Sequence, residues 1–119
     1  MDLVLGAYPL AAGSTVRVVN KTSQAMLSLV LDHSKESIYT MVAEYCLALK
    51  NGATANGTPV VLAACDGGSA QQWEQTALFE IRHVPTGKCL QGVTVPGGAV
   101  TLASCADAAA QTWIWHDQN

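Results

Sequence analysis

Positive charge is scarce in this sequence. Among 119 residues there are six lysines and arginines against nine aspartates and glutamates, which gives a formal net charge of −3. The six cations are scattered singly, so they form no basic stripe that could neutralise the phosphates of a nucleic acid. The composition therefore argues against nucleic acid as a partner.

Long hydrophobic runs are also missing. No run approaches the roughly 18–20 uninterrupted apolar residues that a membrane-spanning helix needs. The opening "MDLVLGAYPLAAG" is apolar in part, but Asp2 stands where a signal peptide carries positive charge. Two explanations stay open: a signal peptide was removed and Met1 added, or export is unconventional.

Catalytic motifs are absent as well. The histidines at 33, 83 and 116 lie in separate parts of the chain, and His83 is expected at the surface or the core edge. Sequential neighbours such as those in "DHSKES" (32–37) cannot point at one another as a catalytic triad requires, so this segment is interpreted as a solvated loop. With no phosphate-binding loop or metal cluster, we predict a non-enzyme without metal or cofactor.

A long internal repeat is the strongest signal present. Residues 60–73 and 100–113 match without a gap at seven of 14 positions, through "VVLAAC"/"VTLASC" and "AQQW"/"AQTW". Upstream, "YCLAL" (45–49) matches "KCLQG" (88–92). Each copy consists of short β-rich runs separated by turns rich in glycine and proline, with no helical periodicity. The pattern predicts one all-β domain over 1–119, closed into a barrel.

The repeated phrase "CL…VxLxxC…AxQxW" resembles the QxW repeat of the ricin B-type lectin family, whose fold is the β-trefoil with pseudo-threefold symmetry. The resemblance implies three lobes, at approximately 1–37, 38–77 and 78–119. It also implies that Trp73 and Trp113 fill the shared core, with Trp115 on the same side of its strand. Gln71 and Gln111 would brace the turn before that strand.

The first lobe departs from the family pattern and looks shortened. Residues 14–30 align with 76–93 as a hairpin, with Met26 where the other copies have cysteine, and no VxLxxC or QxW follows. Because "LVLGAY" (3–8) resembles "VVLAAC" (60–65), we expect it to supply the missing strand from the other side of the hairpin. The alternative is that a second chain completes the lobe, so monomer and homodimer both stay open.

Four cysteines allow three disulfide connectivities. The repeat selects Cys46–Cys65 and Cys89–Cys105, each within its own lobe. Disulfides favour an oxidising compartment, so secretion is predicted. In that setting Asn20 ("NKT") and Asn56 ("NGT") have the form of glycosylation acceptors, which matters only in a secreted eukaryotic protein.

The usual sugar-binding positions of the family lack the residues that bind sugar. The resemblance places the ligand-binding carboxylate at Ala48 and Gln91, the aromatic ring at Ala63 and Ala103, and the asparagine at Ala70 and Ala110. The remaining polar candidates for carbohydrate binding are Asp66, Gln71, Gln91, Asp107 and Gln111. The possible stacking platforms are Tyr8, Tyr39 and Tyr45.

Two functions are therefore predicted. The first is a non-catalytic lectin or carbohydrate-binding module whose partner is a glycan or glycoprotein. The second is a lectin-fold module that has lost sugar binding and contacts a protein, as an inhibitor, a toxin subunit or an assembly component. Many small residues (Ala63, Ala64, Ala103, Ala106 and 108–110) would suit packing against a protein if they are exposed.

Overall fold

The strands and turns of this fold come from a computed structural model, which describes residues 3–7, 10–20, 29–32, 34–40, 44–76, 80–92, 97–106 and 111. These residues form ten short strands and two 3-10 helices. The elements are β1 (Leu3–Gly6), β2 (Arg17–Asn20), β3 (Leu29–Asp32), β4 (Ser37–Thr40), β5 (Tyr45–Leu49), η1 (Lys50–Gly52), β6 (Val60–Ala64), η2 (Ser69–Gln71), β7 (Trp73–Gln75), β8 (Ile81–His83), β9 (Cys89–Gln91) and β10 (Thr101–Ala103).

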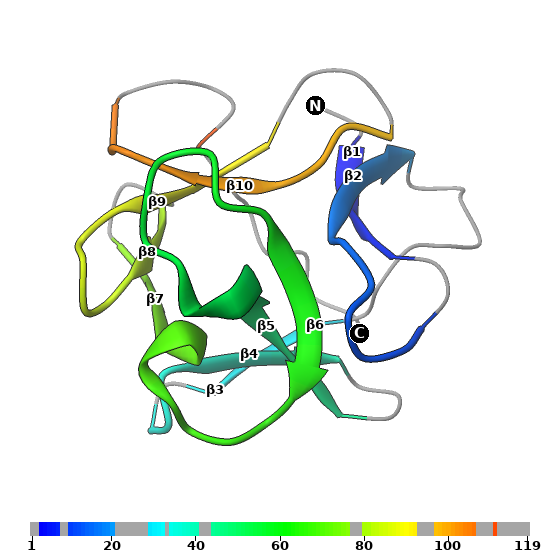
Figure 1. Cartoon of the computed structure of the whole chain (residues 1–119), viewed down its shortest axis with the longest axis horizontal. Coiled ribbons are helices and arrows are strands. Elements are labelled where there is room, and N and C mark those ends of the chain that lie inside the picture. The colour runs from blue at the N-terminus through cyan, green and yellow to red at the C-terminus, as the bar shows by residue number, and fades with distance from the viewer. Residues whose placement is uncertain are drawn as a thin grey trace.

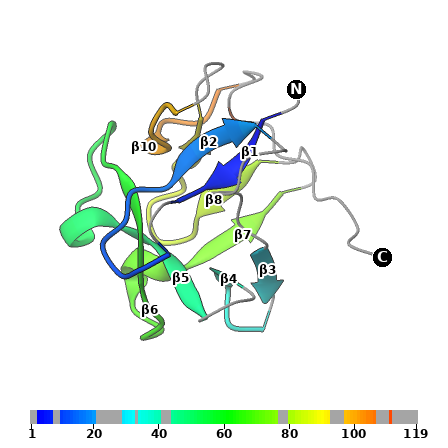
Figure 2. The ribbon, with the colours of Figure 1, turned by 90° about the vertical axis from the view of Figure 1, so that its right-hand side faces the viewer.

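The strands pair antiparallel with their neighbours in sequence, which gives three units. The first hairpin is β1–β2, the second sheet is β3–β6 and the third sheet is β7–β10. In Figure 1 the first hairpin lies on the right, the second sheet at the bottom and centre, and the third sheet at the left and top. Figure 2 shows the first hairpin from its own side, above the second sheet. The three units therefore surround a common interior.

Three buried valines close that interior through a ring of backbone hydrogen bonds. The amide of Val16 donates to the carbonyl of Val60 at 2.8 Å, and the amide of Val60 donates to the carbonyl of Val100 at 3.0 Å. The amide of Val100 donates back to the carbonyl of Val16 at 2.9 Å, and all three side chains are fully buried. Each unit thus contributes one valine in an equivalent place, which is a pseudo-threefold arrangement.

A second ring of equivalent positions is made by glycines. Gly13, Gly57 and Gly97 have φ angles of 90°, 91° and 89°, and each amide donates at 2.7 Å to a carbonyl of another unit. A positive φ of this size is a conformation that residues with a Cβ rarely adopt. The glycine preceding each buried valine by three residues is therefore a requirement of the repeated turn.

These rings correct the predicted register of the first lobe. The segment that contains Val16 is equivalent to the segments around Val60 and Val100, so 14–20 corresponds to 58–64 and 98–104. The predicted match of 14–30 with 76–93 is therefore wrong, and Met26 lies outside the described residues.

The predicted match of 3–8 with 60–65 is wrong for the same reason. Leu5 pairs with Val18 across the first hairpin, as Leu47 pairs with Leu62 across the second sheet. β1 therefore corresponds to β5, the strand that precedes the valine strand. "LVLG" and "VVLA" are both short apolar runs, so their composition does not tell which of two adjacent strands each one forms. In the described residues the first sheet has two strands where the other two sheets have four.

Apolar side chains from all three units pack into one core. Its largest member, Trp73, is fully buried, and its indole N–H donates to the carbonyl of Leu47 at 2.9 Å. Trp113 and Trp115 lie outside the described residues. The other buried members of the core are Leu5, Ala7, Val16, Val18, Ile38, Leu47, Leu49, Val60, Leu62, Ile81, Leu90, Val100 and Leu102.

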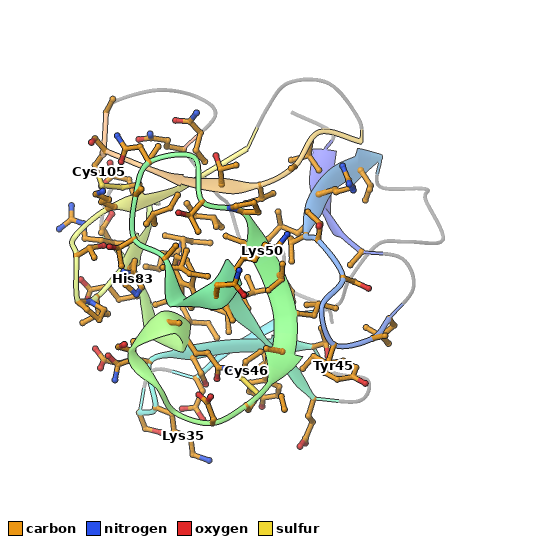
Figure 3. All side chains as sticks on the ribbon, viewed as in Figure 1. Lys35, Tyr45, Cys46, Lys50, His83 and Cys105 are labelled. Atoms are coloured by element: carbon orange, nitrogen blue, oxygen red, sulfur yellow. A yellow bond between two sulfur atoms is a disulfide. The ribbon has the colours of Figure 1, made fainter. Side chains whose placement is uncertain are left out.

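Both predicted disulfides are confirmed. Cys46 is bonded to Cys65, and Cys89 is bonded to Cys105, with a Cα–Cα distance of 5.0 Å in each pair. Each bond joins the third strand of a sheet to the chain just after the fourth strand. Figure 3 shows Cys46 near the lower edge of the molecule and Cys105 near the upper left edge.

Candidate functional site

Gln71 and Gln111 brace the same turn in the second and third units. Gln71 accepts the amide N–H of Asp66 at 2.9 Å and donates to the carbonyl of Ala64 at 2.8 Å. Gln111 accepts the amide N–H of Ala106 at 2.7 Å and donates to the carbonyl of Ser104 at 3.0 Å. Both glutamines are buried, so their amide groups serve the backbone of the turn.

Gln91 adds a side-chain contact in the third sheet. Its Oε1 accepts a hydrogen bond from Nε2 of Gln111 at 2.9 Å, and the Gln91 side chain is partly exposed. Asp66 is exposed, and its Oδ1 accepts the amide N–H of Gly68 at 2.7 Å, as expected of an aspartate in a turn. Asp107 lies outside the described residues. The predicted polar residues thus fall into two separate pairs, Asp66 with Gln71 and Gln91 with Gln111.

A pocket of about 290 Å³ opens on the outer side of the second sheet. The disulfide Cys46–Cys65 and Gly67 form part of its wall. Its other lining residues are Asp32, Lys35, Ser37, Tyr39, Glu44 and Gln71. We call this site the Tyr39 pocket. Tyr39 and Gln71 are predicted candidates from the sequence, but no sequence pattern brings these lining residues together.

Strand alternation explains why Tyr39 faces this pocket. Ile38 and Thr40 of β4 are buried, whereas Ser37 and Tyr39 are partly exposed. Successive side chains of a strand point to opposite faces, so Ser37 and Tyr39 share the outer face. Tyr39 pairs with Cys46 on β5, which places it beside the disulfide.

Asp32 enters the pocket from the end of β3 and is fixed by its own turn. Its Oδ1 accepts the Ser34 hydroxyl at 2.7 Å, the Ser34 amide at 3.0 Å and the Lys35 amide at 3.3 Å. The hydrogen bond from the Ser34 hydroxyl is the main reason why the pKa of Asp32 lies below its ordinary value of 3.8. The segment predicted as a solvated loop is therefore a tight turn between β3 and β4, with an ionised carboxylate at its start.

The equivalent place in the third sheet is filled. Arg82 pairs with Cys89 as Tyr39 pairs with Cys46, so Arg82 and Glu80 occupy the places of Tyr39 and Ser37. Glu80 is buried and bonded to Arg82 at 3.3 Å. Its carboxylate lies within 4.8 Å of both sulfur atoms of the Cys89–Cys105 disulfide. Because those sulfurs are bonded to each other, the group offers no thiolate to a metal.

A family model for the ricin-type beta-trefoil lectin domain matches residues 34–119, which is most of the chain. The chain belongs to the ricin-type β-trefoil lectin family. Members of this family are typically non-catalytic. No curated protein sequence is significantly similar to the chain.

Solved structures confirm the β-trefoil fold. The agglutinin from Abrus precatorius superposes with a TM-score of 0.80 at 18% identity, over 95% of this chain and 44% of that chain. The designed threefold-symmetric protein ThreeFoil gives 0.79 at 20% identity, over 92% and 86% of the two chains. The Haemophilus ducreyi cytolethal distending toxin gives 0.65 at 19% identity, over 94% and 75%. This lectin-family chain thus spans less than half of the agglutinin chain.

The register identifies equivalent positions across the three units. Gly6, Ala48 and Gln91 occupy equivalent places, since each pairs with the residue that follows the buried valine of its unit, namely Arg17, Val61 and Thr101. At the position assigned to the aromatic ring, the equivalent residues are Val19, Ala63 and Ala103.

His83 and Tyr45, two further residues considered from the sequence, lie outside the Tyr39 pocket. His83 is only 1% exposed, so it belongs to the core of the lectin fold rather than to the surface. Tyr45 is partly buried and packs against the core, whereas Tyr8 lies outside the described residues. Within the part of the chain that the structure describes, no helix is both long and apolar enough to cross a membrane.

Proposed function

We propose that this chain is a non-catalytic carbohydrate-binding module. The observation that carries the proposal is the match of residues 34–119 to the ricin-type lectin family on a closed β-trefoil. A glycan or glycoprotein is then the partner. The two disulfides support an oxidising, extracellular site of action. Asn56 is exposed and would be open to glycosylation in a secreted eukaryotic protein.

We infer that the affinity does not come from the usual positions of the family. Gly6 and Ala48 offer no acceptor for a pair of sugar hydroxyls, and Ala63 and Ala103 offer no ring for a sugar face. Each hydrogen bond left unmade by a buried polar group costs about 1–3 kcal/mol. Losing the carboxylate, the ring and the asparagine together would remove ordinary affinity at these positions.

Some of the predicted polar residues still have groups that can form hydrogen bonds with a ligand. Gln71 and Gln111 are engaged by their turns, as described above. This leaves the carboxylate of Asp66, the amide nitrogen of Gln91 and the untested Asp107 as the groups of that set that we propose to contact a glycan.

The second candidate function is a protein-interaction module without sugar binding. Ala64 and Ala106 are exposed, and Ala63 and Ala103 are partly exposed. Small side chains on neighbouring strand ends make a smooth surface that packs against protein more readily than it binds sugar hydroxyls. The likeness of the fold to a cytolethal distending toxin supports this candidate.

A glycan array with the purified protein tests the proposed function, and calorimetric titration of galactose, lactose and xylo-oligosaccharides measures the affinity. Binding to any saccharide supports the lectin function. Asp66→Ala, Gln91→Ala and Asp107→Ala then test the predicted residues, since each should weaken binding if it contacts the glycan. A protein that binds no glycan on the array is not a lectin, and a captured protein partner in a stoichiometric complex would establish the second candidate.

A further inference from the structure

The Tyr39 pocket brings together the groups that recognise a saccharide. A carboxylate accepts hydrogen bonds from two adjacent hydroxyls, and an aromatic ring covers the C–H face of the sugar. Asp32 and Glu44 supply carboxylates here, and Tyr39 supplies a partly exposed ring on the strand paired with Cys46. None of the family's usual positions contributes to this pocket, because Ala48, Ala63 and Ala70 are not among its lining residues.

Asp32 is arranged for ligand binding before any ligand arrives. All the hydrogen bonds that the described residues make to its carboxylate end on Oδ1, which leaves Oδ2 as the acceptor for a ligand. Since the turn already fixes the side chain, binding costs little additional conformational entropy. The carboxylate is therefore a preorganised acceptor.

The third sheet shows that the pocket is not a general consequence of the repeat. There the same place is occupied by the Arg82–Glu80 ion pair beside the Cys89–Cys105 disulfide. Replacing that pair by Tyr39 and Ser37 exchanges a long cationic side chain and a buried acid for a ring and a small hydroxyl. At this place the third unit therefore differs from the second, because an ion pair stands where the second unit has a ring and a hydroxyl.

The charge and the size of the pocket limit what it accepts. The lining carries two carboxylates, Asp32 and Glu44, against the single ammonium group of Lys35, whose side chain Figure 3 shows at the outer edge of the molecule, so the net charge repels anions. A uronate or a sulfated sugar is therefore disfavoured. The volume of about 290 Å³ lies at the lower end of the range for ligand pockets, about 300–1,000 Å³, and suits a single small unit.

We propose that the Tyr39 pocket binds one neutral saccharide unit, with a sugar hydroxyl donating to Oδ2 of Asp32 and the C–H face of the sugar against the Tyr39 ring. This inference rests on the proposed carbohydrate-binding function and assigns that function to a site other than the usual positions of the family.

Nuclear magnetic resonance titration of the uniformly ¹⁵N-labelled chain locates the site. The probes are galactose, lactose and xylobiose, with glucuronate as the anionic control. A neutral probe should shift the amides of 34–40, Glu44 and Gly67, and glucuronate should shift them far less. The amides of Gln91 and 101–103 serve as the internal reference for the usual position in the third sheet.

Variants then test each contact by calorimetry. Tyr39→Ala and Asp32→Asn should each weaken binding about tenfold or more, since a hydrogen bond to a charged group is worth about 1.5–3 kcal/mol. Tyr39→Phe keeps the ring and should stay within about threefold of the wild type. Asp32→Asn retains the Oδ1 acceptor of the turn, so the fold is preserved. Glu74→Gln, at an exposed position of β7, is the control for an equal loss of charge.

The outcomes separate this proposal from the proposed function. Saccharide binding that shifts only the amides near Gln91, or that survives both Tyr39→Ala and Asp32→Asn, overturns the pocket and leaves the lectin function intact. The absence of any saccharide binding by the wild type overturns both.

Discussion

The imidazole of His83 packs edge-on against the indole of Trp73, with ring centroids 5.4 Å apart and planes inclined at 60°. His83 Nε2 lies 2.7 Å from the carbonyl of Ser69 and must be the donor, because a carbonyl oxygen only accepts. Nδ1 contacts the hydroxyl of Thr86 at 2.8 Å. One buried histidine therefore ties η2 after the second sheet to β8 of the third sheet.

We expect His83→Ala to lower the free energy of unfolding by about 2–4 kcal/mol, because it creates a cavity and leaves the Ser69 carbonyl without its donor. Urea unfolding followed by tryptophan fluorescence measures the change. The exposed residue Glu74 provides the control, since Glu74→Ala should change stability by no more than about 0.5 kcal/mol. If His83→Ala is as stable as the wild type, the contacts of His83 between η2 and β8 make no contribution to the free energy of unfolding.

Trp73→Ala should lower the free energy of unfolding by about 3–5 kcal/mol, as large deletions in a packed core do. Trp73→Phe keeps most of the apolar volume but removes the N–H that donates to Leu47. Its cost should be smaller, about 1–3 kcal/mol for the unpaired carbonyl together with the lost volume. Thermal unfolding of both variants checks the order, and equal stability of Trp73→Ala and the wild type is incompatible with the core described above.

Removal of either disulfide should cost about 3 kcal/mol, because the two bonds close loops with sequence separations of 19 and 16 residues. The variants Cys46→Ala with Cys65→Ala and Cys89→Ala with Cys105→Ala should therefore be destabilised to a similar extent in denaturant unfolding. Mass spectrometry of the non-reduced digest should find Cys46 with Cys65 and Cys89 with Cys105. A peptide that joins the two units would contradict this pairing.

Gly57→Ala should destabilise the fold by about 1–2 kcal/mol through backbone strain alone. A Cβ at this position meets no atom within 4 Å, whereas its φ of 91° is unfavourable for any residue with a side chain. Gly13→Ala and Gly97→Ala should cost the same, since their φ angles are 90° and 89°. Ala55→Ser in the neighbouring loop is the control, and widely different values for the three glycines would argue against their equivalence.

The pH dependence of saccharide binding should follow the ionisation of Asp32. Its pKa in the folded protein lies below 3.8, mainly because of the Ser34 hydroxyl. The lowered pKa means that its contribution to stability is present above the unfolded value of about 3.9 and is lost as the pH falls through the folded pKa. Affinity for a neutral sugar should accordingly stay level from about pH 7 to about pH 4 and fall only below that.

Calorimetry in a Glu44→Gln background isolates this effect, because the second carboxylate of the pocket is then removed. Asp32→Asn in the same background should show weak binding with no further loss toward low pH. Affinity that already declines near neutral pH would assign the titration to a group other than Asp32.

The disulfides and the turn-bracing glutamines could be predicted because they lie inside the repeated phrase. Gln71 and Gln111 differ in their surroundings, yet both hold the same pair of backbone groups, so equivalent positions carried equivalent roles. His83 could not be placed in this way, since its burial depends on Ser69 of η2, 14 residues earlier, and on Trp73, which lies opposite it on the neighbouring strand β7. No local pattern indicates that the imidazole will find a backbone acceptor in η2, outside its own sheet.

The Tyr39 pocket was missed for a related reason. Asp32, Tyr39 and Glu44 come from a strand end, a strand and a turn, and no spacing joins them in the sequence. The one local signal was the alternation in "SIYT", which puts Tyr39 on the face opposite Ile38. The family pattern identifies candidate positions that recur in each repeat. The pocket instead depends on residues that differ between the repeats.

The ring of Val16, Val60 and Val100 has a consequence for any part of the chain taken alone. Each valine donates one backbone hydrogen bond and accepts another, so the three hydrogen bonds form a closed ring. Removing the first unit would leave the carbonyl of Val60 without a donor and the amide of Val100 without an acceptor, both at buried positions. The second and third units alone would therefore leave these two backbone groups unpaired. A separate peptide with the sequence of the first hairpin, added in trans, would supply the Val16 amide and carbonyl that pair with them.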